Sequence, residues 1–145
     1  MNTLTGNWAF WAVLSAGFAA LTAIFAKIGV ANVNSDFATF VRTIVVIVAL
    51  AGILTLLGHW QAPSSITTRT YLFLVLSGLG TGASWLCYFH AMKVGDAARV
   101  APVDKLSVVL VAIFGVTFLG EKLSGVNWLG VAMIAGGAVL VALKF

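Results

Sequence analysis

Five long apolar stretches, separated by short polar breaks, constrain this chain more than any other feature. They cover about residues 8–28, 37–57, 71–92, 100–119 and 126–143. Each is close to the roughly 20 residues that a helix needs to cross a bilayer. Backbone groups in lipid must be hydrogen-bonded within the chain, and the runs lack the alternation of barrel strands. We therefore predict an all-α integral membrane bundle of five transmembrane helices, forming a single domain over residues 1–145.

The charge content supports the same prediction and excludes other classes of protein. Only 8% of the residues are charged and 61% are hydrophobic, whereas soluble domains average about 25% charged residues. The net charge of +4 therefore indicates no nucleic-acid partner, because Lys and Arg in a membrane protein chiefly set orientation. We find no metal-ligand cluster, no phosphate-binding loop and no nucleophile beside a base. We expect no catalytic residue, no metal, no cofactor and no enzymatic activity.

Positive charge is concentrated on one side of the predicted bundle. Five helices place the termini on opposite sides, so the loops after the first and third stretches share a side with the C-terminus. That side holds Lys27, Arg42, Lys93, Arg99, Lys105 and Lys144, and the other side holds Arg69 and Lys122. Cytoplasmic loops carry an excess of Lys and Arg. We expect the N-terminus outside, the C-terminus in the cytoplasm, and little tendency to insert in both orientations.

Three charged residues, Arg42, Asp104 and Lys105, fall inside the predicted stretches. A charge in the membrane costs roughly 2.5–3.5 kcal/mol on insertion scales, so each is a candidate to contact a solute or coupling ion. Asp104 and Lys105 are adjacent and point about 100° apart on a helix, whereas Asp104 and Arg42 both lie roughly 6–8 Å below the same surface. We predict that Asp104 pairs with Arg42 at the mouth of a pathway. Alternatively, Arg42 and Lys105 extend their long stems to the headgroups.

Polar residues recur at helical spacing along one face of the third stretch. We expect this face to line the solute path; its members are Ser77, Thr81, Ser84 and Tyr88, with Trp85 beside them. Alternatively, Ser and Thr in membrane helices bond their own backbone or join helices together. Small residues in the third and fifth stretches favour close helix packing, and we assign this role to Gly78, Gly82, Gly130, Ala132 and Gly136.

Several segments of the chain also match a known family. They are SAGFAALTAIFAKIG at 15–29, TFVRTIVV at 39–46, SWLCYFHAMKVGD at 84–96, APVDKLSVV at 101–109 and LGEK at 119–122. From end to end the chain resembles one EamA-like repeat of the drug/metabolite transporter superfamily, in particular the short one-repeat proteins of prokaryotes. Larger members carry two five-helix repeats in inverted orientation around a central cavity. The resemblance implies half of such a transporter.

The resemblance also implies a function and partners. We expect a secondary transporter in a prokaryotic cytoplasmic (inner) membrane, moving a small metabolite or drug-like solute by alternating access. The expected partners are the lipid bilayer, the small-molecule solute, and a second copy in a homodimer or a paired chain of opposite topology. A non-transporting scaffold or accessory subunit is the first alternative. A small multidrug exporter is the second, although its embedded Glu in the first helix has no counterpart within residues 8–28.

Overall fold

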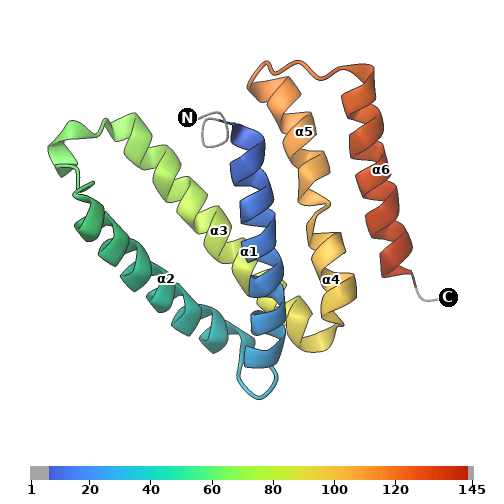
Figure 1. The fold of residues 1–145 in the computed structure, drawn as a ribbon, viewed down its shortest axis with the longest axis horizontal. Helices are drawn as coiled ribbons and strands as arrows, with labels where there is room; N and C mark the ends of the chain where they lie inside the picture. Colours follow the sequence, from blue (N-terminus) through green and yellow to red (C-terminus); the bar gives the residue numbers. More distant parts are fainter. Residues whose placement is uncertain (1–6, 144–145) are drawn as a thin grey trace. The chain divides into compact units, whose positions relative to one another are not determined.

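The computed structural model describes residues 7–143, and these form helices connected by short loops without a strand. In chain order the helices are α1 (Trp8–Gly29), α2 (Ser35–Leu57), the short 3-10 helix η1 (Pro63–Ser65), α3 (Thr68–Val94), α4 (Ala97–Asp104), α5 (Ser107–Phe118) and α6 (Gly125–Ala142) (Figure 1). Lys144, which entered the charge comparison, lies outside the described residues.

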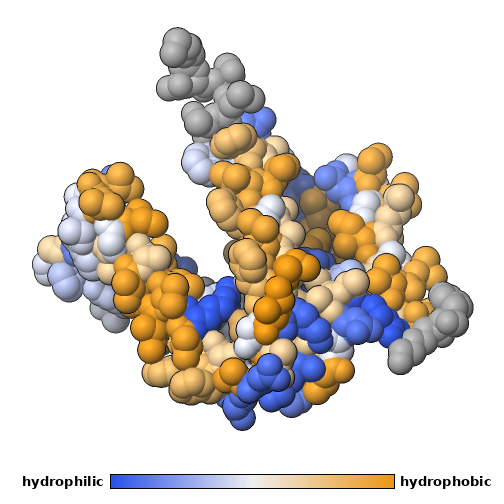
Figure 2. Space-filling view, turned by 60° about the horizontal axis from the view of Figure 1, so that its bottom comes forward, coloured by the Kyte–Doolittle hydropathy of each residue, from blue (hydrophilic) through white to orange (hydrophobic). Residues whose placement is uncertain are grey.

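The helices provide five segments that are long and apolar enough to cross a membrane, as the sequence predicted. These are α1, α2, α3, the α4–α5 pair over Ala97–Phe118, and α6. Their apolar side chains face outward: the exposed fraction is 87% for Leu56 and 80% for Phe118, and hydrophobic colour covers most of the helix surface in Figure 2. Helices that are apolar all round and unburied require lipid as their solvent. The chain is an integral membrane protein with an all-α, five-span architecture.

The fourth span differs from the single helix that we expected. It is divided into α4, which ends at Asp104, and α5, which begins at Ser107. Pro102 lies inside α4; it has no N–H to donate to Ala98, and its ring crowds that carbonyl. Beyond it each backbone hydrogen bond spans three residues instead of the four of an α-helix. Lys105 N–H donates to Pro102 O (3.1 Å) and Leu106 N–H donates to Val103 O (3.0 Å). The helix is therefore interrupted about one turn inside the predicted span.

The ends of α2 are fixed by local side-chain and backbone chemistry. Its start is capped by Asn34, whose side-chain oxygen accepts from Asp36 N–H (2.8 Å) and Phe37 N–H (3.2 Å). The helix begins at Ser35, two residues before the predicted stretch, and Asn is a favoured cap for the free N–H groups of a first turn. At the other end Gly58 adopts φ +65°, a left-handed conformation that ends helices readily at glycine.

The chain divides into two compact units, Met1–Phe25 with Val94–Phe145, and Ala26–Lys93. In the first unit α6 packs against both α4 and α5. Arg99, near the start of α4, donates a side-chain hydrogen bond to the carbonyl of Ala142 at the end of α6. After α5, the backbone N–H of Glu121 donates to the Gly115 carbonyl (3.0 Å), and Gly120 turns the chain with φ +70°.

The second unit has its core at the end where α2 begins and α3 finishes. Val30, Phe89 and Met92 are buried there. Two lysines join the segments: Lys27 Nζ donates to Met92 O, and Lys93 Nζ donates to Val33 O, each at 2.8 Å. From this end α2 and α3 diverge along their length (Figure 1). This joint fixes how the first turns of α2 face the last turns of α3.

Candidate solute-binding residues

The interruption in the fourth span carries an ion pair. Lys105 Nζ lies 3.2 Å from Asp104 Oδ2, with 57% of the lysine side chain and 34% of the aspartate side chain exposed. We expected these neighbours to point apart, as they would on a continuous helix. That expectation was wrong: the two side chains meet although the residues are adjacent, because the long, flexible stem of lysine lets Nζ reach back to the carboxylate. The pair therefore sits at a break in the helix with both charges accessible.

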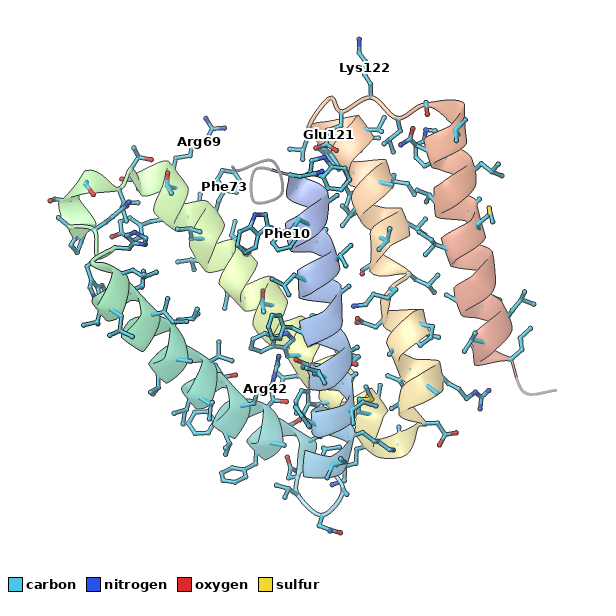
Figure 3. The ribbon with its side chains drawn as sticks, viewed as in Figure 1. Phe10, Arg42, Arg69, Phe73, Glu121 and Lys122 are labelled. Carbon is cyan, nitrogen blue, oxygen red and sulfur yellow. The ribbon has the colours of Figure 1, made fainter. Side chains whose placement is uncertain are left out.

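Arg42 is held by aromatic rings of the neighbouring helix. Its guanidinium carbon lies 4.0 Å from the ring centre of Trp85 and 5.5 Å from that of Phe89. Trp85 and Phe89 are four positions apart on α3 and so share one face of it. In Figure 3 the labelled Arg42 side chain extends from α2 toward α3. The aromatic quadrupole attracts the cation, most strongly over the ring of a tryptophan.

The predicted pairing of Asp104 with Arg42 stays a prediction. Asp104 belongs to the first unit and Arg42 to the second. Each has a different partner within its own unit, namely Lys105 for Asp104 and the two rings for Arg42. The sequence had suggested Arg42 and Trp85 as separate candidates, and the structure brings these two together.

The polar face of the third span divides into residues with different surroundings. The hydroxyl of Thr81 donates to the carbonyl of Ser77 (2.9 Å), which is the backbone bond anticipated for threonines in apolar helices. The rings of Tyr88 and Phe89 meet edge to face at 6.4 Å. Ser84 is exposed. Lining of a solute path by these residues stays a prediction.

The predicted packing residues are not closely approached within their own units. A Cβ atom added to Gly78 or Gly82 in α3, or to Gly130 or Gly136 in α6, would meet nothing within 4 Å. Ala132 lies on α6 with an exposed side chain. Close helix packing at these positions therefore stays a prediction about the assembled protein.

Phe89 belongs to this arrangement and was missed from the sequence. It is buried, beneath the guanidinium of Arg42 and beside Met92 in the core of its unit. The available signal was its spacing from Trp85, the one tryptophan far from a predicted span end. An aromatic residue one turn further along the same face extends the surface offered to a cation.

Comparison with known proteins decides the relationship suggested by these features. A family model described as "EamA-like transporter family" matches residues 6–143. The chain belongs to this family. No solved structure matches it.

Two relatives of this EamA-like chain place it among transporters. A protein of Sinorhizobium sp, named "Uncharacterized transporter in cobO 3'region", is 66% identical over 139 residues, covering 96% of this chain and 99% of the relative. A protein of Bacillus subtilis (strain 168), named "Uncharacterized transporter YxxF", is 23% identical over 145 residues, covering 99% of this chain. The match spans 45% of that second relative, so this EamA-like chain corresponds to about half of its length.

Proposed function

We propose that this protein is a secondary transporter subunit that moves a small metabolite or drug-like solute across the cytoplasmic (inner) membrane of a prokaryote by alternating access. The observation that carries the proposal is the interruption between α4 and α5, with Asp104 and Lys105 beside it. Membership of the EamA-like family supports it. So do the names of both relatives, which are those of transporters.

A broken helix inside an apolar span has a physical requirement. Backbone groups at membrane depth need hydrogen-bond partners, and here i→i−3 bonds supply them, from Lys105 N–H to Pro102 O and from Leu106 N–H to Val103 O. Transporters place such discontinuous helices at their solute sites, where free backbone groups and half-helix ends contact the solute or ion. The charges of Asp104 and Lys105 also require water or a polar ligand there. In this proposal the two residues line the pathway and change partners during transport.

Two copies of the five-span unit complete the transporter in this proposal. The Bacillus subtilis relative is about twice as long as the region matched here, and alternating access commonly uses two repeats that rock about a shared site. A homodimer, or a pairing with a chain of opposite topology, supplies the second repeat. The excess of Lys and Arg on one side supports an N-terminus outside and a C-terminus in the cytoplasm.

The experiment measures solute uptake by the purified protein in proteoliposomes. Vesicles receive a defined mixture of amino acids, monocarboxylates and amines, and mass spectrometry quantifies what each vesicle population accumulates. We expect protein-dependent uptake of at least one compound class, reduced to background by Asp104→Asn. The substitution removes the charge and leaves the size of the side chain almost unchanged.

Asp96→Asn is the matched control, because Asp96 precedes α4 and lies outside the interruption. Its uptake should equal that of the unaltered protein. Normal uptake by a correctly inserted Asp104→Asn variant would remove Asp104 from the mechanism. Absence of any protein-dependent uptake would instead favour a scaffold or accessory subunit.

A further inference from the structure

Arg42 lies within the span formed by α2, and its guanidinium is held against two rings of α3. A rise of about 1.5 Å per residue places Arg42 about 10 Å along α2 from Ser35, and Trp85 about 13 Å along α3 from Val94. These two helix ends are joined in one core. The guanidinium lies nearer to Trp85, at 4.0 Å, than to Phe89, at 5.5 Å. These two contacts hold the guanidinium against the face of α3 that carries Trp85 and Phe89.

Within its own unit Arg42 has no carboxylate as a partner. Asp36 is the only acid within residues 26–93. It lies in the first turn of α2, where its carboxylate accepts a hydrogen bond from the Ser35 hydroxyl (3.3 Å). The same end of the unit holds two further cations, Lys27 and Lys93. The summed field there attracts anions.

The aromatic rings also leave a specific part of Arg42 available. A guanidinium is flat and carries five N–H donors around its edge. Trp85 and Phe89 interact with the cation through their ring faces, and a ring face is a weak acceptor for those donors. The planar fork of N–H groups matches a carboxylate in a two-bond arrangement. The rings thus fix the position of a fork that a carboxylate can accept through two hydrogen bonds.

We propose that Arg42, held by Trp85 and Phe89, binds the carboxylate of the transported solute, so that the solutes are organic monocarboxylates. This inference rests on the proposed transport function and names its solute class. The fork of one guanidinium can donate two parallel hydrogen bonds to the two oxygens of one carboxylate. The neighbouring rings suit a solute whose carboxylate is attached to an apolar or aromatic body.

The first test uses the unaltered protein in detergent and the arginine reagent phenylglyoxal. Mass spectrometry follows the modification of Arg42, Arg69 and Arg99 separately in each sample. The probes are phenylacetate, indole-3-acetate and octanoate, each compared with its primary amide, which has nearly the same shape and no charge. We expect the carboxylates to slow modification of Arg42 and the amides to leave it unchanged, with Arg69 insensitive to both. Equal protection of Arg42 by acids and amides, or protection by none of the probes, overturns the proposal.

The second test measures binding of the same probes by titration calorimetry. Arg42→Gln removes the charge and Arg42→Lys retains it without the fork. We expect affinity for the carboxylates to fall by about tenfold or more in Arg42→Gln and by less in Arg42→Lys. Arg69→Gln is the matched control, because Arg69 also lies over a ring, 5.9 Å from Phe73, at the other end of α3 (Figure 3). An equal loss in Arg69→Gln and Arg42→Gln overturns the proposal.

The two proposals fail separately. Binding in detergent does not require transport, so Arg42-dependent binding of carboxylates without uptake into proteoliposomes would refute transport and retain the site. Uptake of solutes without protection of Arg42 by any carboxylate would retain transport and refute the assignment of solute class. Circular dichroism and gel filtration check that each variant is folded, and the protection test needs no variant.

Discussion

At the scale of single residues, the energies around Arg42 do not balance within its own unit. A cation in the membrane span costs roughly 2.5–3.5 kcal/mol on insertion scales. A cation–π contact recovers about 0.5–2 kcal/mol, and the stronger one here is with Trp85 at 4.0 Å. Water, a bound anion, or the carboxylate of Asp104, whose pairing with Arg42 stays a prediction, can supply the remainder. In our proposal the carboxylate of the solute supplies it.

Substitution of Trp85 tests the contribution of the ring. Trp85→Leu should lower the free energy of unfolding by about 2 kcal/mol, through the lost cation–π contact and lost packing. Trp85→Phe keeps a ring face and should lose clearly less. Thermal unfolding in detergent, followed by circular dichroism, measures both variants. Equal losses would show that Trp85 acts through its volume and not through its interaction with Arg42.

At the scale of elements, the interrupted α4–α5 span is the feature that departs from a simple bundle. Pro102 has no N–H to donate. The residues after it form hydrogen bonds that span three residues instead of four, and α4 ends there at Asp104. A proline in a helix interior is about 3 kcal/mol less favourable than alanine. The chain keeps this cost in a span whose neighbouring helices are continuous. We expect this pattern where the irregular backbone of a span takes part in transport.

Restoring the missing donor tests this interpretation. Pro102→Ala adds an N–H that can donate to the Ala98 carbonyl and removes the ring that crowds it. It should raise the free energy of unfolding by roughly 1–3 kcal/mol and reduce solute uptake. Hydrogen exchange followed by mass spectrometry should show slower exchange over residues 102–108. Pro63→Ala in η1 is the matched control, because Pro63 lies outside the spans. Unchanged exchange in Pro102→Ala would mean that another feature maintains the break.

The sequence predicted the spans well and the contacts between them poorly, for a physical reason. Span identity depends on local length and apolarity, which a bilayer reads directly. The break at Lys105 is also local, but an apolar run that continues on both sides concealed it. The contact of Arg42 with Trp85 depends on how α2 and α3 diverge from their joined end, and residues 43 positions apart do not encode that geometry locally. Depth matching brought Arg42 to attention without identifying its aromatic partners.

At the scale of the whole molecule, an odd number of spans predicts that the two termini lie on opposite sides of the membrane. The distribution of Lys and Arg then predicts which side is cytoplasmic. Inverted pairing of identical chains requires both orientations to be present, whereas pairing with a chain of opposite topology requires only one. Orientation therefore decides between these two routes to a complete transporter.

Labelling of the termini measures the orientation directly. A cysteine is placed at either terminus in a Cys87→Ala background, and a membrane-impermeant maleimide is added to intact cells. We expect the N-terminal cysteine to react in intact cells and the C-terminal cysteine to react only after permeabilisation. Partial labelling of both termini from both sides would contradict this and would establish insertion in both orientations.

Lys27 and Lys93 give the orientation signal a second role. Each donates to a backbone carbonyl, Met92 O or Val33 O, at the end where α2 and α3 are joined. Both also count among the charges from which we predict a cytoplasmic location for this end. A mutation that neutralises either lysine to change how the chain inserts therefore removes a tertiary bond as well. A change to the opposite orientation would therefore require substitutions that move positive charge elsewhere and others that replace these hydrogen bonds. Membrane orientation and the stability of the fold depend on the same two lysines in this region.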